Sequence, residues 1–164
     1  MPICVKCSRK ETIEVVCDSC FLRGLEEKVA KEVKNSQKIS IVDDNSAGAK
    51  TLKAVLEKTA SKRRIPFEIL SEIPESGALL PLTSNQMNSK FLYEIFFRKN
   101  SGIDMQKFIF PLGHILQEDC ERFCRLKGIS FVKDESPDFI KGLKNKSLNF
   151  SLARSREKID EAKK

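Results

Sequence analysis

Four cysteines near the start of the chain form the pattern with the clearest chemistry in this sequence. Cys4 and Cys7 are separated by two residues, and Cys17 and Cys20 repeat that spacing. Each Cys-x-x-Cys pair makes a tight turn that directs two sulfurs at one point, so two pairs supply the four thiolates of a tetrahedral Zn²⁺ site. We therefore predict a structural zinc module at residues 1–22 that folds only with its metal.

Two alternatives for these cysteines stay open. One is a pair of disulfides in a secreted domain, and the other is a set of scattered buried thiols. The residues before Cys4, Met1-Pro2-Ile3, have neither the basic nor the apolar region of a signal peptide. This favours a reducing compartment, where disulfides do not persist, and we expect a cytoplasmic protein.

Three other residues have side chains capable of chemistry. Cys120 and Cys124 are one helical turn apart, a spacing that suits a metal or a cluster. Their neighbours Leu116 and Phe123 place both sulfurs on an apolar face, where a free cysteine acts as a small hydrophobe, and we favour that interpretation. His114, the only histidine, follows a glycine at a predicted helix start and is interpreted as a cap or surface residue rather than a general base.

The composition describes a soluble globular chain of 164 residues with 40% hydrophobic and 32% charged residues. No apolar run approaches the roughly 18 residues of a membrane helix, so we expect no membrane partner. The formal net charge is +7, and a zinc ion bound by four thiolates lowers it to about +5. A polyanion such as RNA is a plausible partner. With one Tyr and no Trp, the sequence shows no aromatic platform for stacking bases.

Short β-branched runs alternate with amphipathic segments along the rest of the chain. The strand-like runs are residues 38–42, 67–70, 78–82, 108–112 and 129–132, and the helical segments are residues 21–34, 50–62, 86–99 and 114–126. This alternation predicts an α/β fold with an open, mostly parallel, Rossmann-like sheet of about five strands, covered by helices on both faces. We divide the chain into the module at 1–22, a linking helix at 23–36, the α/β domain at 37–133 and a C-terminal helical segment at 134–164.

The loop after the first predicted strand occupies the position of a nucleotide site in such a fold. Its sequence includes Asp43, Asp44, Asn45, Ser46 and Gly48. A phosphate-binding loop needs glycines for close backbone approach, whereas the two carboxylates here would repel a pyrophosphate. We therefore predict a degenerate loop. The alternative is a Mg²⁺ ion held by the two aspartates and bridging to a phosphate.

The order of these features resembles that of a known family. The cysteine frame with the helix and strand that follow it, residues 80–92, residues 110–120 and the closing residues 139–158 together resemble the cytoplasmic tRNA 2-thiolation protein 2 family, also called cytosolic thiouridylase subunit 2. The cysteine frame is the most specific match.

This resemblance implies a fold like that of the PP-loop ATP pyrophosphatases, whose active members have the loop Ser-Gly-Gly-x-Asp-Ser. The matching positions here are residues 44–49, and both signature glycines are absent. The family implies a non-catalytic subunit that forms a heterodimer with a catalytic thiouridylase. That complex 2-thiolates the wobble uridine of certain tRNAs, with sulfur delivered by a ubiquitin-related carrier protein.

We therefore expect a pseudo-enzyme subunit with structural zinc and no catalytic residues. Two alternatives remain: an ATP-dependent tRNA thiolase that uses the two aspartates for Mg²⁺ and Cys120 with Cys124 for sulfur or a cluster, and an unrelated zinc-ribbon interaction protein. The candidate phosphate contacts to tRNA are basic residues, which are Arg63, Arg64, Lys141, Lys144, Lys146, Arg154 and Arg156. The first two also complement a helix C-terminus, which is an equally good explanation for them.

Overall fold

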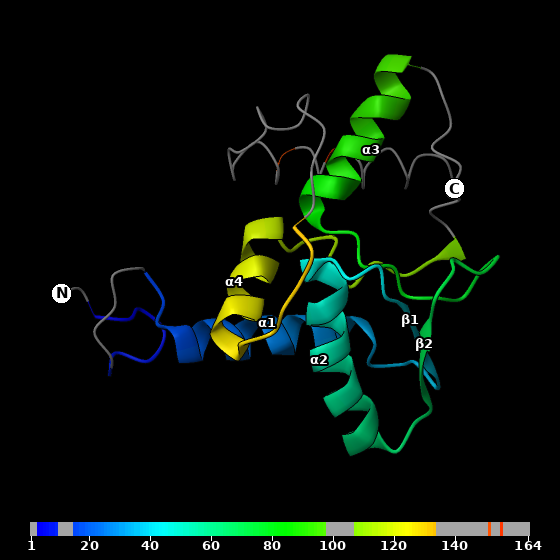
Figure 1. The fold of residues 1–164 in the computed structure, drawn as a ribbon. Helices are drawn as coiled ribbons and strands as arrows, with labels where there is room; N and C mark the ends of the chain where they lie inside the picture. The colour runs from blue at the N-terminus through cyan, green and yellow to red at the C-terminus, as the bar shows by residue number, and fades with distance from the viewer. Residues whose placement is uncertain (1–2, 10–14, 98–106, 134–150, 152–154, 156–164) are drawn as a thin grey trace.

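A computed structural model describes residues 3–9, 15–97 and 107–133, together with residues 151 and 155 (Figure 1). The elements follow the order α1 (Asp18–Glu32), β1 (Ile39–Val42), α2 (Ala47–Arg63), β2 (Phe67–Leu70), α3 (Ser84–Phe97) and α4 (Gln117–Lys127). Most of the predicted C-terminal segment at 134–164 lies outside the described residues. All four helices lie where the hydrophobic periodicity predicts them, with bounds shifted by a few residues.

The sheet is smaller than predicted. β1 and β2 pair in parallel, with Ile39 opposite Phe67 and Val42 opposite Leu70. The expectation of about five strands is wrong, because only these two form within the described residues. The run at 78–82 contributes a single residue, Leu79, which forms one parallel bridge to Ile41 and another to Ile109 in the run at 108–112.

Proline explains why these two runs stay so short. Pro81 and Pro111 interrupt the predicted strands, and a proline has no N–H to continue a hydrogen-bond ladder. The fifth run reaches only the loop after β1, where the Val132 amide donates to the Asn45 carbonyl over 2.9 Å. The result is a short sheet extended on one side by two single-residue bridges.

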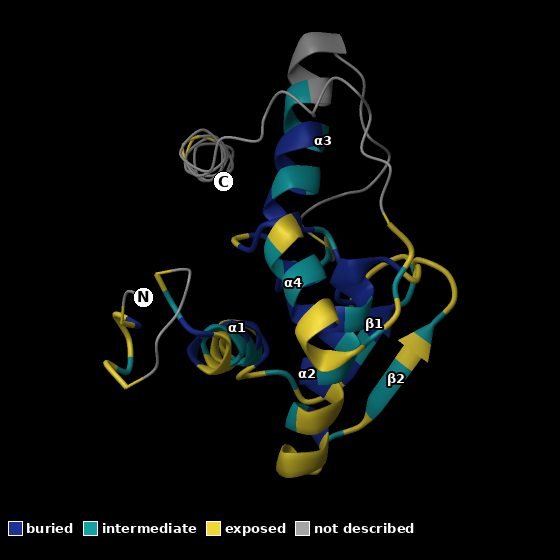
Figure 2. Cartoon of the chain, turned by 60° about the vertical axis from the view of Figure 1, so that its left-hand side comes forward, coloured by how far each residue is buried: buried dark blue, intermediate teal, exposed yellow. Residues whose placement is uncertain are grey.

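The main core lies on one face of this sheet. Ile39 and Ile41 of β1 join a cluster made with buried side chains of three helices, which are Leu25, Val29, Leu52, Val55, Leu56, Ala60, Cys120, Phe123 and Cys124. Figure 1 and Figure 2 show α1, α2 and α4 gathered on the same side of β1 and β2. The other face has a smaller cluster built on Val42, Ala78 and Leu80. No helical residue whose side chain is described belongs to it, so within the described residues the predicted helical cover of both faces is found on one.

Helix α2 connects the sheet to this core. Ser46 begins it, since its Oγ accepts the Ala49 amide over 3.2 Å and satisfies one of the free N–H groups of the first turn. Gly48 lies so close to the neighbouring segment that a Cβ atom there would come 2.5 Å from the Pro81 carbonyl oxygen. The start of α2 is therefore held against residues 81 and 112, with no space for a larger side chain.

No helix in the described part of the chain is both long and apolar enough to span a membrane.

Candidate metal centre and the loop after β1

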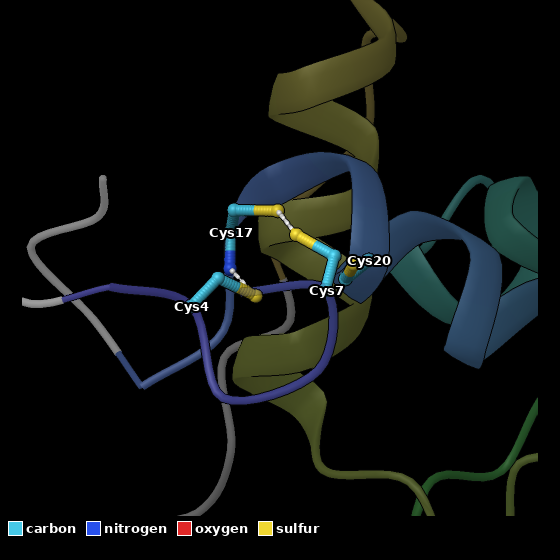
Figure 3. A group of neighbouring side chains, drawn as sticks. All are labelled: Cys4, Cys7, Cys17 and Cys20. Atoms are coloured by element: carbon cyan, nitrogen blue, oxygen red, sulfur yellow. Dashed lines mark hydrogen bonds between the residues drawn. The ribbon is translucent and has the colours of Figure 1, made fainter. Parts of the chain in front are cut away.

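The four N-terminal cysteines converge, as their spacing predicts. Cys4 and Cys7 lie on a turn in which the Ser8 amide donates to the Cys4 carbonyl, while Cys17 caps α1 and Cys20 lies in its first turn. All four sulfurs are within 4.8 Å of one another, and Figure 3 shows the side chains facing a common point. Two local turns, one of them stabilised by a helix, thus build the cluster.

Hydrogen bonding gives these thiols different acidities. The Cys17 amide donates to the Cys4 sulfur over 3.3 Å. This bond is the main reason that the pKa of Cys4 falls to about 6. The amide of Arg9 lowers the pKa of Cys7 in the same way. Burial and the neighbouring thiols instead raise the pKa of Cys20 to about 12. When a metal ion binds thiols held this close, the thiols lose their protons, because the positive ion offsets the repulsion between the thiolates.

The sulfur separations fit one metal ion. A tetrahedron with bonds of about 2.3 Å has edges of about 3.8 Å, and the Cys7 and Cys17 sulfurs are 3.9 Å apart. A four-iron cluster occupies more space than a single ion and holds its cysteine ligands further apart. These four cysteines can therefore bind a metal, and their geometry favours a mononuclear site.

The metal module is joined to the α/β domain through α1 and α4. Asp18, between two of the cysteines, accepts a 2.7 Å hydrogen bond from the Arg122 guanidinium of α4. The same guanidinium lies 4.3 Å from the centroid of the Phe21 ring. Arg122 was not singled out from the sequence. It connects the first turn of α1, where the cysteine cluster lies, to α4.

The loop after β1 satisfies its own amides. Asp43 accepts the Asn45 amide over 2.9 Å and Asp44 accepts the Ser46 amide over 3.0 Å. Asn45 has a positive φ of 63°, which turns the chain into α2. In a phosphate-binding loop, such amides face the ligand. Here side chains of the same loop occupy them.

Lys50 completes this arrangement. Its ammonium lies 3.1 Å and 2.9 Å from the two Asp43 carboxylate oxygens and 2.7 Å from the Asn45 side-chain oxygen. Burial acts to raise the pKa of Asp43, but the hydrogen bonds from Lys50 and the Asn45 amide, with the charges of Lys50 and Lys53, outweigh it and lower that pKa. The carboxylate is thus ionised and internally neutralised. Sequence reasoning missed Lys50, although its place one turn into α2 was a usable signal.

The remaining predicted residues have varied environments. Cys120 and Cys124 are buried between α4 and α2, where burial raises the pKa of both thiols. His114 lies exposed in the turn before α4.

Two of the candidate tRNA contacts lie at the end of α2. Arg63 donates to the Val33 and Ser36 carbonyls over 2.7 Å and 2.8 Å, and Arg64 ends α2 in the left-handed conformation. The other five candidate tRNA contacts, Lys141, Lys144, Lys146, Arg154 and Arg156, lie outside the described residues.

No protein-family model and no curated protein matches this sequence. Among solved structures, the chain is similar to the U34-tRNA thiolase NcsA from Methanococcus maripaludis, solved with its 4Fe-4S cluster. The TM-score is 0.68 at 12% sequence identity, and the match covers 96% of this chain and 87% of that one. The chain has the fold of this thiolase.

The shared fold extends over nearly the whole chain, so the α/β architecture predicted from the sequence is confirmed even though the sheet is smaller. At 12% identity the likeness concerns the backbone, and the chemistry must be argued from the side chains described above.

Proposed function

We propose that this protein is a non-catalytic subunit of a tRNA wobble-uridine 2-thiolation complex. In this role it forms a heterodimer with a catalytic thiouridylase and helps to bind tRNA in the cytoplasm, while a ubiquitin-related carrier protein supplies sulfur. The fold shared with a U34-tRNA thiolase supports a role in tRNA thiolation. The resemblance of the cysteine frame to the cytosolic thiouridylase subunit 2 family supports the role of a non-catalytic subunit.

The closed loop after β1 is the observation that supports a non-catalytic role. Adenylation of a uridine needs ATP with its phosphates held by backbone amides and a divalent cation. The Asn45 and Ser46 amides are already bonded to carboxylates of the loop, and both oxygens of Asp43 are bonded to Lys50. Binding of ATP and Mg²⁺ would have to break these bonds and place the phosphates beside two carboxylates.

The environment of the cysteines also supports a non-catalytic role. The chain has six, and four of them form the N-terminal cluster. The other two are buried, and burial raises the pKa of both thiols. The Cys124 sulfur lies 3.7 Å from the Thr51 hydroxyl oxygen and 3.6 Å from the Ala47 carbonyl oxygen. Among the described residues, no further cysteine, histidine or carboxylate joins the sulfurs of these two cysteines in a group that could hold a metal, and a reactive cysteine needs an accessible thiolate. We assign Cys120 and Cys124 to the core.

We propose Zn²⁺ for the N-terminal site, with Cys4, Cys7, Cys17 and Cys20 as its ligands. Four thiolates around one point form a closed structural site, because no position is left for a substrate. The ion would link the turn at residues 3–9 to α1 and so stabilise a segment with little hydrophobic core of its own.

Reconstitution tests the proposal. The tagged chain is purified from its own cells, and the associated proteins are identified by mass spectrometry. We expect a stoichiometric thiouridylase, and thiolation of tRNA by the complex but by neither subunit alone. The chain alone, incubated with ATP, Mg²⁺ and tRNA, is expected to release no pyrophosphate. Pyrophosphate release by the isolated chain would instead identify it as an ATP-dependent thiolase.

A further inference from the structure

The outer side of the cysteine cluster is a basic concavity that the proposed function has not used. It has a volume of about 660 Å³, and its described lining consists of Lys6, Cys7, Arg9, Cys17, Ser19, Cys20 and Arg23. Three cations from two separate segments, the turn at residues 3–9 and helix α1, thus face the space beside three of the four cysteines. We infer that this concavity binds the phosphodiester backbone of RNA.

Local geometry positions one of these cations and leaves another available. Lys6 extends across α1 at Gly24, where a Cβ atom would come 2.8 Å from its ammonium. The absence of a side chain at position 24 is what allows this approach. Arg23 pairs with Glu27 at 4.0 Å, but both side chains are about 70% exposed, so this contact is weak. The guanidinium of Arg23 remains available to a stronger anionic partner.

The cations of the lining offset the charge of the metal centre. Four thiolates with one divalent ion have a net charge of about −2, which Lys6 and Arg9 balance. Arg23 pairs weakly with Glu27, and the N-terminus of α1 adds the positive end of its dipole at the same place. An anion entering the concavity therefore competes with Glu27 for Arg23 and gains from the helix dipole.

The lining also indicates which part of RNA is recognised. It includes no aromatic side chain among the described residues, so it offers no surface on which a base can stack. Cations together with a serine hydroxyl suit phosphate oxygens, and such contacts position a nucleic acid without reading its sequence. The inference rests on the proposed tRNA role and assigns the contact to a surface distinct from Arg63 and Arg64.

Paired triple substitutions test this inference. The full-length chain with Lys6→Gln, Arg9→Gln and Arg23→Gln is compared with a control carrying Lys31→Gln, Lys34→Gln and Lys133→Gln, three exposed lysines away from the concavity. Both lose the same charge. We expect the first set to raise the Kd for tRNA at least about tenfold and to lower the slope of log K against log salt by about 2 to 3. The control is expected to change Kd by about twofold or less.

A charge-preserving variant and metal analysis complete the test. Lys6→Arg, Arg9→Lys and Arg23→Lys should keep the wild-type affinity, and all variants should keep one metal ion per chain. Equal losses in both triple variants, metal loss in the first set, or no tRNA binding by the wild-type chain would each overturn the inference. Binding is measured without the thiouridylase, so the thiolation assay remains an independent test of the proposed function.

Discussion

The cysteine cluster and the loop after β1 each gather several polar groups within a few residues, yet the two regions satisfy those groups differently. In the cluster, four sulfurs lie within 4.8 Å of one another. In the loop, each aspartate accepts a backbone amide and Lys50 neutralises Asp43. The first arrangement can bind an ion from outside, and the second is complete within the protein.

This contrast shows that the residue types at a position do not by themselves make a binding site. Carboxylates at the end of a parallel strand are common ligands of Mg²⁺. Here their lone pairs are used by the chain itself, and the same position becomes a structural turn. Four substitutions test this contrast.

Cys17→Ser is expected to remove the metal and unfold the N-terminal module. A structural zinc ion contributes on the order of 10 kcal/mol of binding free energy in small modules, and three thiolates cannot close the site. Metal per chain, measured by elemental analysis, should fall from about one to near zero. The control is Ser19→Ala, between the two ligands of α1, which should keep the metal. Full metal content in Cys17→Ser would show that the cluster does not bind its ion through all four cysteines, and would contradict the contrast.

Gly48→Ala is expected to destabilise the protein by about 2 kcal/mol, because the new methyl group would overlap the Pro81 carbonyl oxygen. The control is Gly24→Ala, where the close atom is the mobile end of Lys6. There the gain in helix propensity should make the change neutral or slightly stabilising. Urea denaturation measures both. Equal stabilities for the two variants would show that the start of α2 is not held as tightly as the structure indicates.

Asp43→Asn is expected to lower stability by about 1 to 2 kcal/mol at pH 7, because it removes the charge paired with Lys50. The pKa of Asp43 is lower in the folded state than in the unfolded chain. Its contribution is therefore present above the unfolded pKa of about 4 and is lost as the pH falls through the folded value. The gap between wild type and variant should close in acid. Asp44→Asn, which can still accept the Ser46 amide, should show a smaller gap at pH 7.

Arg122→Ala has the smallest expected effect, about 1 kcal/mol, since it removes one exposed ion pair to Asp18 and one contact with the Phe21 ring. The comparison is Arg125→Ala, whose pair with Glu121 is longer, at 3.6 Å, and should contribute less. Thermal denaturation of the metal-loaded protein measures both. An unchanged melting temperature in Arg122→Ala would mean that the two regions are not coupled through this contact.

The helices and the cysteine cluster could be predicted from the sequence because their signals are local. The spacing of the cysteines is set by two turns, and the apolar stripe of each helix repeats within a few residues. Ser46 and Gly128 also mark the start of α2 and the end of α4, where they cap the chain as such residues usually do.

The sheet could be predicted only in part, since strand pairing depends on distant residues. Ile39–Val42 and Phe67–Leu70 have no proline and pair over four residues each. The apolar runs that contain Pro81 and Pro111 look equally strand-like in composition, but their ladders end after one bridge. The prolines were visible in the sequence and should have been given more weight.

Two aspartates without the signature glycines predict a degenerate loop, but the hydrogen-bond partners of these aspartates could not be predicted from spacing alone. Lys50 reaches Asp43 because Asn45 turns the chain through a positive φ and brings α2 back over the loop. The hydrogen bonds of Arg63 could not be predicted from spacing either, because the Val33 and Ser36 carbonyls that accept them are 30 and 27 residues away in the sequence.

Leu79 constrains how the chain length can vary. Its amide donates to the Ser40 carbonyl and its carbonyl accepts the Val42 amide, while the next amide, of Leu80, donates to the Ile109 carbonyl. Leu79 belongs to the helix-covered core, whereas Leu80 belongs to the cluster on the opposite face. A shift of one residue would exchange these faces. Insertions and deletions are therefore tolerable in the exposed stretch before Gly77. Within residues 78–80, a one-residue insertion or deletion would move core side chains to the opposite face of the sheet.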